Sequence, residues 1–251
     1  GQGPLFSSVS QIFAAMDRWA AASPRYLSVY RAADPATNQS FPVARFTDHT
    51  LPRPAGQPPR RRILLTCAVH ARELVVSDVC LHVLRLLAGT PADRDPVVAW
   101  PETRAALAKS GILDRGRSPV GPPGSDPIAQ FASSFSQRYE LHVAPLVNID
   151  GRLLIERAGK YDQRKTVPDE VDLNRNFHHA WSPAAGSPSS QTYPGPYPAS
   201  QWEVSFTETV AGNCKASVRA HTSFGCSFRR PFLTTPLAAS TRTNQKQKKQ
   251  T

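Results

Sequence analysis

The strongest constraint on the fold is an apolar run that passes directly into a second apolar stretch of different period. Residues 63–69 are continuously apolar and partly β-branched, which is typical of a strand buried on both faces. From Leu74 the apolar residues recur at helical spacing, and we expect that helix to end near Gly89. A buried strand followed at once by a helix predicts an α/β domain with a largely parallel sheet.

Further strand and helix patterns extend this arrangement along the chain. Helical spacing of apolar residues predicts a first helix over residues 9–19, and a later helix is expected over 201–211. Short strands are expected at residues 27–31, 43–47, 140–148 and 216–221. Together these elements predict a three-layer α/β domain, in which helices flank a central mixed, largely parallel sheet.

Composition divides the chain into a folded part and a tail. We assign residues 1–232 to one domain, interrupted at about 90–130 by a Pro-, Gly- and Ser-rich surface insertion. Residues 233–251 form a basic, low-complexity tail with too few apolar side chains to fold alone. Residues 229–251 hold six basic and no acidic residues, so they carry about half of the chain's net charge of +11. We therefore expect no nucleic-acid binding, although a basic module for acidic partners stays open as an alternative.

The cysteines and the hydropathy pattern exclude some classes of protein. The four cysteines lack CxxC pairing, so a cysteine zinc site is not expected. Cys67 and Cys80 lie in apolar stretches and are predicted to be buried small hydrophobic residues. Spacing alone leaves open whether Cys214 and Cys226 are bridged. No apolar run has transmembrane length and no signal peptide is visible, while localisation stays open between extracellular, vesicular and cytoplasmic.

Side chains with metal-binding chemistry follow the ends of predicted strands. His70 and Glu73 come directly after residues 63–69, and His221 ends the last predicted strand. Functional groups gather at the carboxyl ends of strands in such sheets, and a His-x-x-Glu spacing brings both side chains to one point. Two imidazoles and one carboxylate suit Zn²⁺, and three protein ligands leave a fourth position for water. We therefore predict that His70, Glu73 and His221 bind one zinc ion.

Five motifs resemble, in order, those of the M14 family of zinc metallocarboxypeptidases. They are VHAREL at 69–74, NIDG at 148–151 (with Ile149 where proline is usual), VDLNRNF at 171–177, YPGP with the following helix start at 193–204, and HTS at 221–223. The resemblance covers residues from about 9 to about 232. It implies a carboxypeptidase-like domain that hydrolyses C-terminal residues of peptides or proteins through a zinc-activated water, and we expect a monomer.

The resemblance also implies roles for five polar residues besides the zinc ligands. Asp172 looks like the residue that accepts a hydrogen bond from the first zinc-binding histidine and fixes its tautomer. Asn174 and Arg175 resemble the residues that bind the C-terminal carboxylate of the substrate, and Arg72 would line the same pocket. Arg164, aligned with a gap, looks like the arginine that stabilises the oxyanion.

The proton-transferring residues of the family have no counterpart in this chain. In the family, a general-base Glu and a capping Tyr lie well beyond the second zinc-binding histidine. The thirty residues after His221 contain no Asp, Glu or Tyr. We therefore expect the last strands and helix of the family's domain to be missing. This leaves a second alternative, a truncated and inactive zinc-binding protein that binds peptide C-termini without hydrolysis.

Overall fold

A computed structural model describes residues 6–33, 40–52, 60–89, 127–212, 216–219 and 227–229. The tail predicted at 233–251, most of the insertion predicted at about 90–130, His221, Cys214 and Cys226 all lie outside the described residues. Within the described part, no helix is both long enough and apolar enough to cross a membrane.

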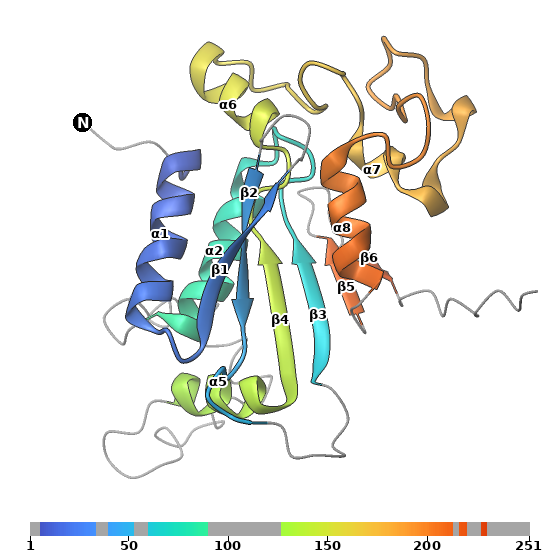
Figure 1. Ribbon diagram of the computed structural model, residues 1–251. Helices are drawn as coiled ribbons and strands as arrows, with labels where there is room; N and C mark the ends of the chain where they lie inside the picture. The colour runs from blue at the N-terminus through green and yellow to red at the C-terminus, as the bar shows by residue number, and fades with distance from the viewer. Residues whose placement is uncertain are drawn as a thin grey trace, which may run out of the picture.

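The described strands form one mixed sheet in the order β1-β2-β4-β3-β5-β6 (Figure 1). Their bounds are Leu27–Ala33 (β1), Ser40–Phe46 (β2), Arg61–Thr66 (β3), Tyr139–Ala144 (β4), Ala216–Arg219 (β5) and Ser227–Arg229 (β6). β3 pairs in parallel with β4 and β5, whereas the β1–β2, β2–β4 and β5–β6 pairs are antiparallel. The mixed sheet is confirmed, but its parallel part is confined to the three central strands. Only six residues separate β1 from β2, too few for the crossover connection that parallel pairing requires.

Helices cover both faces of this sheet, so the predicted three layers are present (Figure 1). The α-helices are Val9–Ala22 (α1), Leu74–Ala88 (α2), Pro127–Arg138 (α5), Ile149–Ala158 (α6), Leu173–Asn176 (α7) and Trp202–Gly212 (α8), with 3₁₀ turns at His178–Ala180 and Pro183–Ala185. One buried core joins α1, α2 and α5 to the sheet. A second core joins the sheet to α8 and to the start of α7. The three-layer α/β architecture with a central mixed sheet, predicted from the sequence, is therefore confirmed.

Two helices begin where the sequence predicted a loop or a turn. α5 starts at Pro127, inside the predicted insertion, because proline suits the first position of a helix. The NIDG motif has the composition of a turn and follows the strand expected at 140–148, but it is the start of α6: the Asn148 side chain accepts a hydrogen bond from Gly151 N at 3.0 Å. Asn, Asp and Gly are favoured in turns and at helix starts alike, so local composition does not separate the two.

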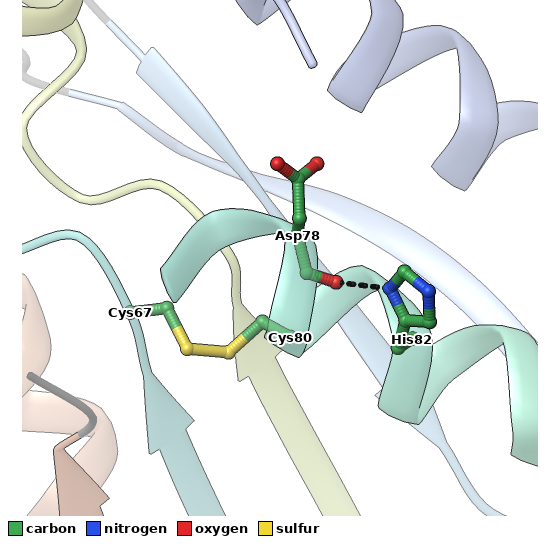
Figure 2. Close-up of a disulfide and its surroundings, with 4 residues drawn as sticks. All are labelled: Cys67, Asp78, Cys80 and His82. Carbon is green, nitrogen blue, oxygen red and sulfur yellow. Dashed lines mark hydrogen bonds between the residues drawn. A yellow bond between two sulfur atoms is a disulfide. The ribbon is translucent and has the colours of Figure 1, made fainter. Parts of the chain in front are cut away.

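Cys67 and Cys80 are buried, as predicted, but they form a disulfide, which the sequence analysis did not expect (Figure 2). Cys67 follows β3 and Cys80 lies in α2, with the two Cα atoms 6.5 Å apart. Figure 2 shows Asp78 and His82 on the same helix, where the His82 Nδ1 atom hydrogen-bonds the Asp78 carbonyl oxygen at 2.7 Å. The bridge was missed because it depends on how α2 packs against the end of β3.

A polar cluster centred on Glu140 lies at the opposite end of β4 from the predicted site. Glu140 is only 6% exposed, and its carboxylate accepts hydrogen bonds from His142 Nε2 at 2.9 Å and Arg45 Nη2 at 2.6 Å. It also forms an ion pair with Arg62, whose Nε atom lies 3.0 Å away. The hydroxyl oxygen of Tyr30 lies 2.9 Å from Nδ1 of His142. The cluster lines a cavity of about 410 Å³, and none of the predicted site residues contributes to its walls. The cavity is lined by Ser28, Tyr30, Arg45, Arg62, Glu140, His142 and Val210.

We predict that Glu140 makes stability depend on pH. The hydrogen bond from His142, together with that from Arg45, outweighs burial and lowers the pKa of Glu140 from 4.5 to about 2. The carboxylate therefore stabilises the fold above about pH 4.5, and this contribution is lost as the pH falls towards 2. Glu140→Gln should lower the free energy of unfolding by roughly 2–3 kcal/mol at pH 7.

Urea denaturation at pH 7 and pH 3 measures this effect. The deficit of Glu140→Gln relative to wild type should shrink at pH 3. Glu170→Gln is the control, because the Glu170 side chain is 49% exposed and its pair with Lys165 contributes little. An equal deficit for Glu140→Gln at both pH values would contradict the prediction.

Candidate metal centre

His70 and Glu73 lie on the short loop that connects β3 to α2. Their exposed fractions are 3% and 4%, so both polar side chains are buried. Backbone hydrogen bonds tie this loop to the segment after β4: Val147 N donates to Cys67 O and Asn148 N donates to Ala68 O, both at 3.2 Å. The start of the loop is therefore fixed to this segment, which restricts where the two side chains can point.

Gly151 of α6 supports the loop at a point of very close approach. A Cβ atom at this position would lie 2.7 Å from Ala71 Cβ, 2.7 Å from Asn148 Oδ1 and 3.0 Å from Lys165 O. Ala71 stands directly between His70 and Arg72. The glycine lets α6 pack against the loop that bears the candidate ligands.

Gly151→Ala is therefore expected to displace the loop and to lower the free energy of unfolding by about 1–3 kcal/mol. Gly212→Ala is the matched control, because a Cβ atom there meets nothing within 4 Å. Thermal unfolding and zinc affinity of both variants would be compared with wild type. Unchanged stability in Gly151→Ala would show that α6 does not brace the loop in this way.

The two ring nitrogens of His70 face two different carboxylates. Nε2 lies 3.0 Å from Asp172 Oδ1, and Nδ1 lies 3.1 Å from Glu73 Oε1. Because a carboxylate can only accept, Nε2 carries a hydrogen and donates to Asp172. Nδ1 faces Glu73. It donates to that carboxylate when the ring is charged, and it can offer a lone pair to a metal when the ring is neutral.

The pKa directions fit this arrangement. Burial alone would raise the pKa of Asp172, but hydrogen bonds from His70 and Arg164 outweigh it, and the net pKa lies below the ordinary value. Burial alone would lower the pKa of His70, but hydrogen bonds to Asp172 and Glu73 outweigh it, and the net pKa is raised. A metal at Nδ1 needs the lone pair of that nitrogen, so metal binding would compete with protonation of the His70 ring.

The donor set and its spacing fit zinc. Zinc bonds to histidine nitrogen and carboxylate oxygen measure about 2.0–2.2 Å, so two tetrahedral ligands stand roughly 3.3–3.5 Å apart. The 3.1 Å between His70 Nδ1 and Glu73 Oε1 is close to that value. No group of three or more His, Cys, Asp or Glu side chains suited to a metal is found among the described residues. The predicted third ligand, His221, lies outside them, two residues after β5 ends at Arg219.

Arg164 lies beside this pair rather than apart from it. Its Nε and Nη2 atoms donate to Asp172 Oδ2 at 3.2 and 2.7 Å, and Nη1 lies 3.3 Å from His70 Nδ1. Only 14% of the Arg164 side chain is exposed. The role in oxyanion stabilisation implied by the resemblance stays a prediction, and the contacts observed here are to Asp172 and His70.

The predicted substrate-binding residues lie close to Asp172 along the chain. Asp172 is the N-cap of α7, and its Oδ1 atom accepts a hydrogen bond from Asn174 N at 3.0 Å. Asn174 and Arg175 are half-buried on α7, whereas Arg72 is exposed on the loop between His70 and Glu73. Their roles in binding a carboxylate stay predictions.

Asn176, to which the sequence analysis assigned no role, organises the segment after α7. It is fully buried, and its Nδ2 atom lies within 3.0 Å of Pro194 O, Tyr197 O and Ser200 Oγ. Its Oδ1 atom accepts from Gln201 N at 3.0 Å. The only sequence signal was its place in the 171–177 motif, since these partners lie 18–25 residues away.

Comparison with known proteins finds one matching family model and several solved structures of similar fold. Residues 129–225 match the family model described as zinc carboxypeptidase. Carboxypeptidase A from Helicoverpa armigera is 18% identical, with a TM-score of 0.61 over 88% of this chain and 46% of that one. Thrombin-activatable fibrinolysis inhibitor is 17% identical, with a TM-score of 0.56 over 85% and 46%. Its bovine form, in complex with tick carboxypeptidase inhibitor, is 17% identical, with a TM-score of 0.55 over 86% and 60%.

The solved structures are only 17–18% identical to this chain, and their likeness establishes its fold. The family model supports a zinc carboxypeptidase-like domain over residues 129–225, which are less than half of the chain. No curated protein matches the chain. The chain spans about half the length of the first two solved structures it matches.

Proposed function

We propose that this zinc carboxypeptidase-like domain binds one zinc ion through His70, Glu73 and His221, and that it serves in hydrolysing C-terminal residues of peptides. The observation that carries the proposal is the buried pair of His70 Nδ1 and Glu73 Oε1, 3.1 Å apart, with Asp172 on the other ring nitrogen. Burial of both ligands keeps competing water away from the pair. The bound zinc would activate a water molecule and polarise the scissile carbonyl.

The substrate's C-terminal carboxylate would be bound by Asn174 and Arg175. A guanidinium presents two parallel N–H groups to a carboxylate, which gives both charge and orientation. Asp172 is both the N-cap of α7 and the acceptor for His70 Nε2, so it connects the helix that bears Asn174 and Arg175 to the candidate ligand His70. Arg72, exposed on the ligand loop, adds a second positive charge for the same carboxylate.

A second candidate function is the binding of peptide C-termini without hydrolysis. It requires the zinc site and the carboxylate-binding residues Asn174 and Arg175, but no group that takes a proton from water. Hydrolysis needs a base to take the proton of the attacking water, and such a base contributes roughly 10²–10⁴-fold to the rate. Both candidates require the zinc site, so zinc binding is tested first.

Zinc content after dialysis, measured by elemental analysis, tests the metal site. Wild type should retain about one zinc per chain, and His70→Ala should retain almost none. His82→Ala is the matched control, because His82 lies on α2 and contacts a helix carbonyl. Equal and negligible zinc in wild type and His70→Ala would contradict both candidate functions. The remaining alternative would then be a basic module that binds acidic partners.

Release of C-terminal residues separates the two candidates. A mixture of unmodified peptides and the same peptides with amidated C-termini would be incubated with zinc-loaded and chelator-treated protein. Mass spectrometry should show zinc-dependent shortening of the unmodified peptides alone. Binding of unmodified peptides without shortening would favour the second candidate.

A further inference from the structure

The Asp172 carboxylate is fully enclosed and fully hydrogen-bonded. It is 0% exposed. Oδ1 lies 3.0 Å from both His70 Nε2 and Asn174 N, while Oδ2 accepts from Arg164 Nε and Nη2. A carboxylate offers about four acceptor sites, so all of them are used. The two oxygens therefore have different partners, because Oδ1 faces the histidine and Oδ2 is held by the arginine.

Arg164 is itself anchored to the ligand loop through its backbone. Its carbonyl oxygen accepts hydrogen bonds at 3.3 Å from Ala71 N and from Asn148 Nδ2. Its side chain reaches from there to Asp172, with 14% of its surface exposed. One residue therefore connects the loop that bears His70 to the carboxylate that orients the ring of His70.

We propose that Arg164 is a positioning residue that fixes the Asp172 carboxylate, and through it the tautomer and orientation of the His70 ring. This inference rests on the proposed zinc site and differs from the oxyanion role that the resemblance implies. Without the guanidinium, Asp172 loses two of its hydrogen bonds and its counter-charge, and is free to turn away from His70 Nε2. The third contact, from Nη1 to His70 Nδ1, is the one that a metal at Nδ1 would replace.

Zinc affinity, measured by competition with a chromophoric chelator, tests the inference. Arg164→Gln should weaken zinc binding by about 10–100-fold, the usual effect of losing a residue that supports a metal ligand. Arg164→Lys keeps the charge but lacks the two-pronged geometry, and should fall between Arg164→Gln and wild type. Unchanged zinc affinity in Arg164→Gln, with hydrolysis alone impaired, would assign Arg164 to the oxyanion and overturn the positioning role.

The chain offers a matched control for removing such an arginine. Arg25 donates to Asp48 Oδ2 from Nε at 3.2 Å and Nη2 at 2.8 Å, almost the same geometry as Arg164 on Asp172. Asp48 is also fully buried, and neither residue is a predicted site residue. Arg25→Gln should leave zinc affinity unchanged, which separates a local effect on His70 from a general loss of stability. Weakening by both variants to the same degree would overturn the inference.

A measurement on the metal-free protein tests the inference even if the protein does not bind zinc. Nitrogen-15 NMR of the His70 ring reports which nitrogen carries the hydrogen, and how fast that hydrogen exchanges with water. Arg164→Gln should speed exchange of the Nε2 hydrogen and disturb its resonance, whereas Arg25→Gln should not. An unchanged His70 resonance in Arg164→Gln would overturn the positioning role. Absence of zinc binding in wild type would instead overturn the proposed function.

Discussion

Asp172→Asn is expected to lower the free energy of unfolding by about 3 kcal/mol, because it breaks a buried ion pair and leaves one partner uncompensated. The asparagine keeps the shape of the side chain but replaces one oxygen by an amide nitrogen. That nitrogen would face either the two donors of Arg164 or the Nε2 donor of His70. Two hydrogen-bond donors would then face each other at a buried position from which water is excluded.

Urea denaturation of wild type and Asp172→Asn measures this loss. The control is Asp169→Asn, three residues earlier, because Asp169 is exposed and accepts one hydrogen bond from Gln201 Nε2 at 3.1 Å. The control should change stability by at most about 0.5 kcal/mol. A loss below about 1 kcal/mol in Asp172→Asn would show that the pair with Arg164 does not contribute as its geometry indicates.

Removing the Cys67–Cys80 disulfide is expected to destabilise the protein by about 3 kcal/mol. The bridge closes a loop with a sequence separation of 13, and a loop of this size restricts the unfolded chain by about that free energy. The loop includes the candidate ligands His70 and Glu73. Its loss should therefore loosen the ligand segment as well as lower overall stability.

The double variant Cys67→Ala, Cys80→Ala would be compared with wild type in denaturation experiments with and without a reductant. The reductant should lower the stability of wild type towards that of the variant and leave the variant unchanged. The variant retains Cys214 and Cys226, so any effect of the reductant through these two cysteines would also be seen in the variant. Equal stability of wild type in both conditions would contradict a stabilising bridge.

The unit that runs from β3 to α2 was predictable because its signals are local. A continuous apolar run of strand length and a change to helical spacing lie next to each other in the chain. The spacing of His70 and Glu73 likewise placed both side chains at the same strand end, and the structure brings them to 3.1 Å. Neighbouring residues share a backbone segment, so their proximity follows from its local conformation.

Partnerships between distant residues required the tertiary structure. The contact of His70 with Asp172, separated by 102 residues, was expected only through the family resemblance. The contacts of Arg164 with both residues were not expected at all. The Glu140 cluster was missed for the same reason, since Arg45 and Glu140 are 95 residues apart and meet only because β2 pairs with β4.

The sequence by itself determined the α/β class of the fold, the position of the ligand loop between β3 and α2, and the identity of two candidate zinc ligands. It also suggested a third ligand, His221, which stays a prediction. Only the tertiary structure decided which nitrogen of His70 faces Glu73, which side chain holds Asp172, and that Cys67 is bridged to Cys80. The physical reason is that periodicity and spacing specify local conformation. Hydrogen bonds and disulfides between elements depend instead on how helices and strands pack in space.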